Sequence, residues 1–144
     1  MKKINLKITT PERVLLEEEI DEIVVPTRSG QITVLPDHES LISEIVPGEM
    51  IIRNQKQEKI VLIFGGFIHV QTGSKVIILA DSAEHLHEVN EKEAEEARRR
   101  AEAFMREVRN DKERFADAEA ELIRNLARLK VIKKYHSRRG MKLE

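Results

Sequence analysis

The distribution of proline and glycine divides this chain into two parts. All four prolines and five of the six glycines lie in residues 1–83, while residues 84–144 hold 16 Lys/Arg and 14 Asp/Glu among 61 positions. Proline and glycine mark turns between short strands, whereas a mixture of Ala, Glu, Arg, Lys and Leu favours long helices. The sequence therefore predicts a strand-rich part, a helical part and a boundary near residues 83–90.

The first part alternates polar and apolar residues. Residues 3–9 and 19–25 show the period of two that is typical of half-buried strands, and Pro26 is expected to end the second one. Turn residues separate the further strands that we predict, at 31–35, 41–46, 50–53, 59–64, 67–71 and 75–80. No long helical pattern lies between them, so a β-sandwich or barrel is expected rather than a parallel sheet with crossover helices.

The second part has the apolar spacing of two helices. Asn90, followed three residues later by Glu93, resembles a capping box at the start of the first helix, and Asp111 is expected to cap the second. The predicted apolar stripes are Ala94, Ala97, Ala101, Phe104, Met105 and Val108 on the first helix, and Phe115, Ala118, Leu122, Leu126 and Leu129, widened by Ile123, Ala127 and Val131, on the second. We expect a helical hairpin over residues 85–144 whose basic tail is frayed from about residue 134.

The overall composition excludes several classes of protein. Lys+Arg (25) and Asp+Glu (26) nearly cancel, so the chain is neither a globally basic nucleic-acid binder nor an acidic solvating chain. Without cysteine there is no disulfide framework and no cysteine nucleophile. The most apolar stretch, residues 60–70, is far shorter than the ~20 residues that span a bilayer, and the alternating N-terminus lacks the apolar run of a secretory signal. We expect a soluble globular protein of the cytoplasmic type.

No group of residues in the sequence predicts an active site. There is no G-x-S-x-G elbow and no phosphate loop of the Walker type, and Gly65–Gly66 lies between two apolar strands, as a tight turn does. We interpret His85 and His87 as polar residues of the junction, because a metal site would need further ligands. His69 is expected at the rim of the strand-rich part. We therefore expect no catalytic residue, no metal and no cofactor.

The C-terminal helix carries a run of positive charge. Between Leu122 and Leu143 there is no acidic residue, and the basic ones are Arg124, Arg128, Lys130, Lys133, Lys134, Arg138, Arg139 and Lys142. Such a run suits nucleic acid, an anionic membrane or an acidic protein surface, and it is also favourable by itself near a helix C-terminus. Arg124 and Arg128 are four residues apart, so they share a helix face that could hold one anion.

Four segments have a specific order and spacing: Ser29–Leu41 (SGQITVLPDHESL), Pro47–Gly48, Gly65–Val70 (GGFIHV) and Leu79–Glu84 (LADSAE). Together they closely resemble the epsilon subunit of F-type ATP synthases over nearly the whole chain, with Thr33 and Ser40 as departures from the family's usual Gly and Pro. The resemblance implies an α+β fold. An N-terminal antiparallel β-sandwich of about ten short strands (residues 1–84) is followed by a C-terminal α-helical hairpin (residues 85–144).

The resemblance also implies a role for each part. It implies a non-catalytic subunit of the central rotor stalk, whose sandwich binds the gamma subunit and the membrane c-ring and couples proton flow to ATP synthesis. The residues that fall where this family touches the c-ring are Ser29, Gly30, Gln31 and His38. The implied location is peripheral, on the cytoplasmic face of a bacterial plasma membrane, without insertion.

The family resemblance implies two states of the helical hairpin and an inhibitory function. In the compact state the hairpin docks beside the sandwich, and in the extended state it enters the alpha/beta catalytic hexamer and inhibits ATP hydrolysis. The basic residues expected to meet acidic groups there are Arg124, Arg128, Lys130, Lys133 and Lys134.

Some bacterial members bind ATP on the folded hairpin through an (Ile/Leu)-Asp-x-x-Arg-Ala motif and later arginines. Here the matching stretch is Leu86–Glu91 (LHEVNE), in which His87 replaces the Asp and Asn90 replaces the Arg. Arg124 and Arg128 match the later pair and are the residual ATP contacts that the resemblance leaves. Because an acid and an arginine are missing, we expect weak or absent ATP binding.

Two other interpretations belong to different classes of function. One is an adaptor protein that binds nucleic acid through its basic C-terminal helix. Base stacking needs aromatic residues, and this chain has one Tyr (Tyr135) and no Trp, which argues against the adaptor. The other is a stand-alone enzyme, for which no catalytic group is apparent.

Overall fold

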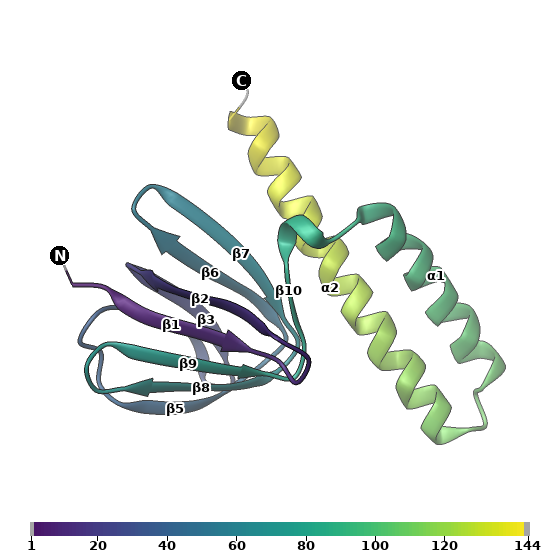
Figure 1. The fold of residues 1–144 in the computed structure, drawn as a ribbon. Coiled ribbons are helices and arrows are strands. Elements are labelled where there is room, and N and C mark those ends of the chain that lie inside the picture. The colour runs from purple at the N-terminus through teal and green to yellow at the C-terminus, as the bar shows by residue number, and fades with distance from the viewer. Residues whose placement is uncertain (1, 143–144) are drawn as a thin grey trace. The chain divides into compact units, whose positions relative to one another are not determined.

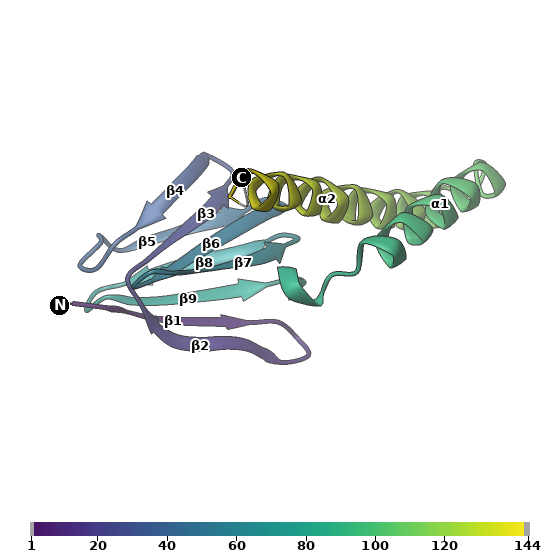
Figure 2. The same ribbon diagram turned by 90° about the horizontal axis from the view of Figure 1, so that it is seen from above.

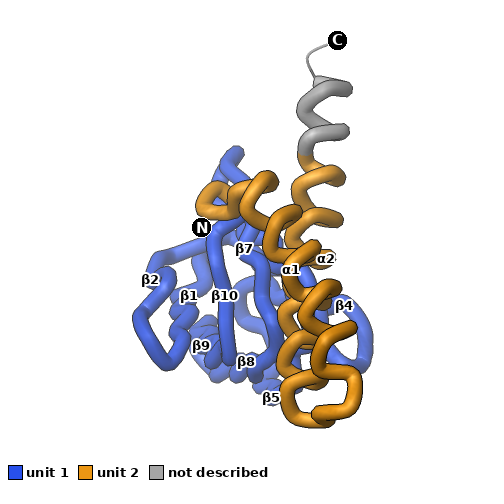
Figure 3. Tube along the Cα trace, turned by 90° about the vertical axis from the view of Figure 1, so that its right-hand side faces the viewer, with its two compact units in different colours: residues 1–86 blue, residues 87–144 orange. Residues whose placement is uncertain are grey.

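The structure is a computed structural model that describes the backbone of residues 2–142 and the side chains of residues 2–135. The chain divides into two compact units, residues 1–86 and 87–144 (Figure 3). Within the described residues, ten strands are followed by a short 3-10 turn and two α-helices (Figure 1). The predicted fold class, a β-sandwich followed by a helical hairpin, is confirmed.

The strands are short and follow one another closely. They are β1 (Ile4–Thr9), β2 (Val14–Ile20), β3 (Glu22–Thr27), β4 (Gly30–Val34), β5 (Leu41–Ile45), β6 (Gly48–Asn54), β7 (Gln57–Ile63), β8 (Gly66–Gln71), β9 (Lys75–Ala80) and β10 (Ala83–His85). Their hydrogen bonds form one continuous path, β10-β7-β6-β3-β5-β8-β9-β1-β2, with β4 paired to β3 beside it. The path folds around a single core (Figure 2), so β2 and β10 are its two ends.

Strand β3 joins the two layers of the sandwich. Its first residues, Glu22–Val24, pair with β6, and its last residue, Thr27, pairs with Ile45 of β5. The second layer contains the parallel pair of β1 and β9, while the other pairings are antiparallel. A strand pair so distant in sequence requires the whole first unit to be folded.

The core follows the period-two pattern of the sequence. On β1, for example, Ile4, Leu6 and Ile8 are buried while Asn5 and Lys7 are exposed. The largest fully buried side chains are Ile4, Leu6, Ile8, Ile20, Ile23, Ile45, Met50, Ile52, Leu62, Ile63, Ile68 and Ile78. Full burial of such a side chain contributes about 1.5–3 kcal/mol, so this unit has a strong hydrophobic drive to fold.

The Gly65–Gly66 pair makes the tight connection that the sequence predicted. Gly66 has a φ of 137°, and a Cβ added there would lie 2.2 Å from the carbonyl oxygen of Leu79. Only glycine allows this close approach between β8 and β9. The residue is therefore required by packing as well as by backbone conformation.

The strand predicted at residues 19–25 is wrong in its bounds. The chain bends at Asp21, which separates β2 from β3, and Pro26 lies inside β3 instead of ending it. Pro26 is tolerated there because it pairs with Gln31 of β4 and its carbonyl accepts from the Val46 N–H at 3.0 Å. The sequence missed β2 and β10 because neither has a clear alternation.

The second unit is an antiparallel hairpin of α1 (Glu91–Glu107) and α2 (Lys112–Lys142), preceded by the 3-10 turn Leu86–Glu88. Both predicted caps are confirmed. The Asn90 side chain accepts from the Glu93 N–H at 3.1 Å, and the Asp111 carboxylate accepts from the Arg114 N–H at 3.2 Å. Two capped helices joined by a short turn are thus fixed by local sequence.

The apolar stripes of the hairpin agree with the predicted ones in part. Helix α1 buries Ala94, Ala101 and Val108, but Phe104 is 40% exposed. On α2 the predicted members Ile123 and Leu126 are about half exposed. The buried residues of α2 include the predicted Ala118, Leu129 and Val131, together with Asn125 and Ile132, which the prediction missed.

The backbone of α2 is helical to Lys142, past residue 134, from which the sequence analysis expects a frayed tail. Lys and Arg are good helix formers, and a single glycine, Gly140, does not end the helix.

Candidate interaction sites

The turn Ser29–Gly30 is a polar tip between β3 and β4. Gly30 has a φ of 115° and open space around it, and the Thr27 hydroxyl donates to its carbonyl oxygen at 2.5 Å. Beside the turn, Arg28 is ion-paired with Glu44 at 2.9 Å. Ser29, Gly30 and Gln31 are exposed on a rigid hairpin, which is the form that a loop contact with another protein needs.

His38 lies at the other end of β4. Its backbone N–H donates to the Leu35 carbonyl oxygen at 3.2 Å, and the neighbouring Asp37 is ion-paired with Lys2 at 2.6 Å. Five residues of β4, at about 3.3 Å per residue, separate this loop from the Ser29–Gly30 turn. The structure therefore does not bring His38 together with Ser29, Gly30 and Gln31.

An exposed apolar face covers β5, β8 and β9, and the sequence analysis missed it. Ile42 is 68% exposed, Phe67 54% and Leu79 56%. Phe67 is paired with Leu79 across the sheet, and Ile42 is paired with His69. We call Ile42, Phe67, Ile77 and Leu79, with His69 among them, the apolar face.

The apolar face could have been found from the alternation of its strands. In β8 the residues 66, 68 and 70 point into the core, so 67, 69 and 71 point outward. His69 is thus not a rim residue, because it pairs on one side with Ile42 and on the other with Ile77. Large side chains left outside on neighbouring strands are typical of a protein–protein contact.

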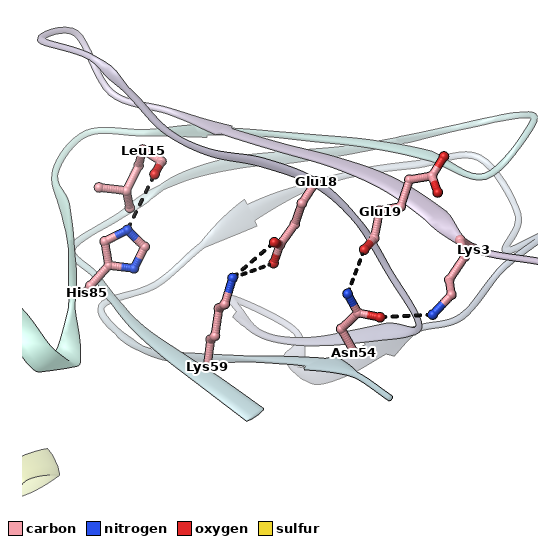
Figure 4. Close-up of polar contacts among 7 residues, drawn as sticks. All are labelled: Lys3, Leu15, Glu18, Glu19, Asn54, Lys59 and His85. Carbon is pink, nitrogen blue, oxygen red and sulfur yellow. Dashed lines mark hydrogen bonds and ion pairs between the residues drawn. The ribbon is translucent and has the colours of Figure 1, made fainter. Parts of the chain in front are cut away.

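Side chains close the gap between the two ends of the sheet path (Figure 4). The imidazole of His85, on β10, lies 3.4 Å from the Leu15 carbonyl oxygen, Lys59 is 3.0 Å from both carboxylate oxygens of Glu18, and Asn54 donates to the Glu19 carbonyl oxygen at 3.0 Å. We call this line of contacts the sheet gap. It gives His85 a structural partner inside the sandwich.

The basic residues of α2 have partners within the hairpin. Arg124 donates to Glu121 at 3.0 Å, Arg128 donates to the Asn125 side chain at 2.8 Å, and the Lys134 ammonium lies 5.7 Å from the centre of the Tyr135 ring. Lys130 and Lys133 are exposed. The side chains of Arg138, Arg139 and Lys142 lie outside the described residues.

Carboxylates dominate the start of α1. A hollow there is lined by Asn90, Glu91, Lys92, Glu95, Glu96 and Arg99. Arg98 hydrogen-bonds Glu95 and holds the pKa of that carboxyl below its usual value, with smaller contributions from Arg99 and from Lys133 of α2. Glu95 is therefore kept ionised, and the hollow does not offer the positive surface that a nucleotide phosphate requires.

No three His, Asp or Glu side chains among residues 2–135 are grouped so that they could hold a metal ion. No helix in the described part of the chain is long and apolar enough to cross a membrane. Three surface features are candidates for contact with other molecules: the Ser29–Gly30 turn, the apolar face and the basic side of α2.

The chain is a two-unit protein in which a β-sandwich with an exposed apolar face is followed by a charged helical hairpin. The family model for the ATP synthase delta/epsilon chain β-sandwich domain matches residues 3–86, and the model for its long α-helix domain matches residues 87–133. The chain belongs to the ATP synthase delta/epsilon family, as the resemblance in the sequence indicated.

Individual relatives agree with this assignment. The ATP synthase epsilon chain of Herpetosiphon aurantiacus is 42% identical over 130 residues, which is 90% of this chain and 94% of that one. The epsilon chain of Dehalococcoides mccartyi is 37% identical over 134 residues, 93% and 95% of the two chains. A cryo-EM structure of the Euglena gracilis mitochondrial ATP synthase, comprising OSCP, F1 and the c-ring, holds a chain that matches with a TM-score of 0.70 and 25% identity, covering 83% of this chain and 75% of that chain.

Proposed function

We propose that this chain is the non-catalytic epsilon subunit of the central rotor stalk of an F-type ATP synthase. In this role it couples proton flow through the c-ring to ATP synthesis and restrains ATP hydrolysis through its C-terminal helices. The observation that carries the proposal is the match of both units, in order and over residues 3–133, to the two domains of one family. The likeness to a chain in an assembly of F1 and c-ring supports it.

The apolar face is the proposed contact with the gamma subunit. A rotor subunit must stay attached to the shaft under torque, which requires a rigid base and buried apolar area. The face meets both needs, because its residues extend from the outer side of three paired strands whose inner side is the core. His69 is the one polar member of its central row, between Ile42 and Ile77.

The proposed contact with the c-ring is made by polar loops. Ser29, Gly30 and Gln31 are offered by one end of the sandwich and His38 by the opposite end of β4. A ring that meets one end of the sandwich would contact the Ser29–Gly30 turn, and His38 would then face another part of the stalk. The protein would sit peripherally at the cytoplasmic face of a bacterial plasma membrane.

The hairpin is the proposed brake, by which we mean the part of the chain that inhibits ATP hydrolysis. In the extended state Arg124, Arg128, Lys130, Lys133 and Lys134 would pair with acidic residues of the alpha/beta hexamer. Arg124 pairs with Glu121 at the surface of α2 and Lys133 acts electrostatically on Glu95 of α1, and exposed ion pairs of this kind are weak enough to be exchanged for others. An exchange of this kind suits a two-state element with a small free-energy difference.

The test is co-purification followed by enzymology of the assembled complex. The tagged full chain, expressed with gamma and with an F1 hexamer, should purify with gamma, and removal of residues 87–144, which keeps β10 in the sandwich, should raise ATP hydrolysis while leaving coupling intact. Recovery of RNA or DNA in place of gamma would support the adaptor. Unchanged hydrolysis after truncation would remove the inhibitory part of the proposal.

A further inference from the structure

One polar residue lies in the apolar stripe of α2. Asn125 is only 1% exposed, and the stripe around it consists of Ala118, Leu122, Leu129 and Ile132. The positions of this stripe recur at alternating intervals of four and three residues, which is the spacing of side chains along the contact line of two packed helices. Ala118 follows closely on the turn between the helices and is buried, so the stripe from Ala118 to Leu129 is the side of α2 that faces α1, while Ile132 lies beyond the level of Glu91, where α1 begins. We call the contact between the helices the hairpin seam.

The opposite side of the hairpin seam is made of small residues. Ala94, Ala101 and Val108 are spaced seven residues apart on α1, and all three are buried. The helices run antiparallel from a turn near Asn110 (Figure 1), so residues equally distant from Asn110 lie at the same level. By this count Asn125 is level with the turn of α1 that carries Ala94.

The hydrogen bonds of Asn125 stay within its own helix. Its side-chain N–H donates to the Glu121 carbonyl oxygen at 2.8 Å, and its side-chain oxygen accepts from the Arg128 guanidinium at 2.8 Å. Both partners belong to α2, and the structure describes no hydrogen bond from Asn125 to α1. These two bonds are therefore available whether or not α1 is in place.

We propose that Asn125 is a built-in weak point of the hairpin seam that favours separation of α1 from α2. An apolar side chain at this position would become exposed when the helices part, and the hydrophobic effect would oppose that step. Asn125 keeps both hydrogen bonds in the separated state, and water is able to satisfy its remaining N–H. It therefore opposes separation far less than an apolar residue does.

The weak point matters because the hairpin seam is thin. Alanines on α1 bury little apolar area, so replacing one apolar position on α2 by a polar residue removes a large share of the apolar contact that holds the helices together. The Asn125 side chain also holds Arg128, one of the basic residues proposed to meet the catalytic hexamer. Asn125 thus weakens the hairpin seam and also positions Arg128, a cation that is proposed to act once the helices have separated. The significance for the assembled complex rests on the proposed function, but the weak point itself is a property of this chain.

Hydrogen–deuterium exchange of the α1 amides in the full chain tests the inference. A 17-residue helix is marginal alone, so exchange in α1 reports separation of the helices. Asn125→Ala should slow α1 exchange about tenfold, because it removes a buried amide from the seam. Asn125→Asp should speed α1 exchange, because it adds a charge there.

The matched control is Glu119→Ala, an exposed position on the same helix that also gains helix propensity. The inference is overturned if α1 exchange is unchanged or faster in Asn125→Ala, or if Glu119→Ala slows it equally. ATP hydrolysis by the assembled complex provides an independent reading. Slower α1 exchange in Asn125→Ala, together with unchanged inhibition, would uphold the weak point and contradict the proposed brake.

Discussion

Lys59 and Glu18 join strands from opposite ends of the sheet path, with the lysine ammonium 3.0 Å from both carboxylate oxygens (Figure 4). The pair is one of several side-chain contacts that close the sheet gap where no backbone ladder does. Asn54 is the most connected of these residues, because it accepts from Lys3 at 2.9 Å and donates to the Glu19 carbonyl oxygen at 3.0 Å.

These contacts predict different costs for two substitutions in the sheet gap. Lys59→Met should lower the free energy of unfolding by less than about 1 kcal/mol, because the ion pair is partly exposed to solvent. Asn54→Ala should lower it by about 1–3 kcal/mol, because two partners lose their hydrogen bonds. Urea denaturation of the full chain measures both values. An equal loss in the two variants would show that Asn54 has no special role in closing the gap.

Gly66 and Gly73 provide a matched pair for the backbone argument. Gly73→Ala should cost about 1–2 kcal/mol, since φ is 83° but the space around it is open. Gly66→Ala should cost at least about 3 kcal/mol, because the new Cβ would also collide with the Leu79 carbonyl oxygen. Thermal and chemical denaturation measure the difference. Similar losses at both positions would contradict the close approach of β8 and β9.

The apolar face predicts where gamma binding is sensitive to charge. Phe67→Asp should weaken the binding of gamma at least about tenfold, because an anion would be buried in an apolar contact. Val14→Asp is the control, since Val14 is 50% exposed but belongs to β2, outside the face. Calorimetric titration of gamma into each folded variant gives the dissociation constants. If Val14→Asp weakened binding as much as Phe67→Asp, gamma would bind elsewhere.

Two ion-paired carboxylates, one half-buried and one exposed, make stability depend on pH in the acidic range. A hydrogen bond from Lys3, supported by the Gln55 N–H, lowers the pKa of Asp21, and a hydrogen bond from Lys2 lowers the pKa of Asp37. A lowered folded-state pKa stabilises the protein above the unfolded value of about 3.9, and this contribution is lost as pH falls through the folded values.

The melting temperature of the full chain, followed from pH 6 to pH 2.5, tests this dependence. Asp37→Asn should make the decline below about pH 4 shallower, because one of the groups with a lowered pKa is gone. Lys2→Met should have the same effect, and the double variant should add nothing. A decline as steep as that of the unmodified chain in Asp37→Asn would refute this contribution.

Nucleotide binding is expected to be weak because of the residues at the start of α1. His87 and Asn90 stand where the family motif has Asp and Arg, and Asn90 is engaged in capping the helix. Glu91, Glu95 and Glu96 in the adjoining hollow would repel phosphate groups. Calorimetric titration with ATP should therefore show no micromolar binding by the full chain. A micromolar dissociation constant would contradict this prediction.

The sequence by itself determined the features that depend on neighbouring residues. Alternation placed Ile4, Leu6 and Ile8 in the core, and Asn90 and Asp111 were recognisable as caps, because a strand face or a helix end is defined within a few residues. The Gly65–Gly66 turn and the fold class follow from the same local rules.

Only the tertiary structure decided the features that join distant segments. The parallel pairing of β1 with β9 and the side chains that close the sheet gap depend on which strands become neighbours. The buried side of α2 was predicted only in part, because apolar residues such as Leu126 surround much of the helix and the burial of Asn125 depends on what packs against that side. Periodicity shows that a face exists, but burial is settled by what packs against it.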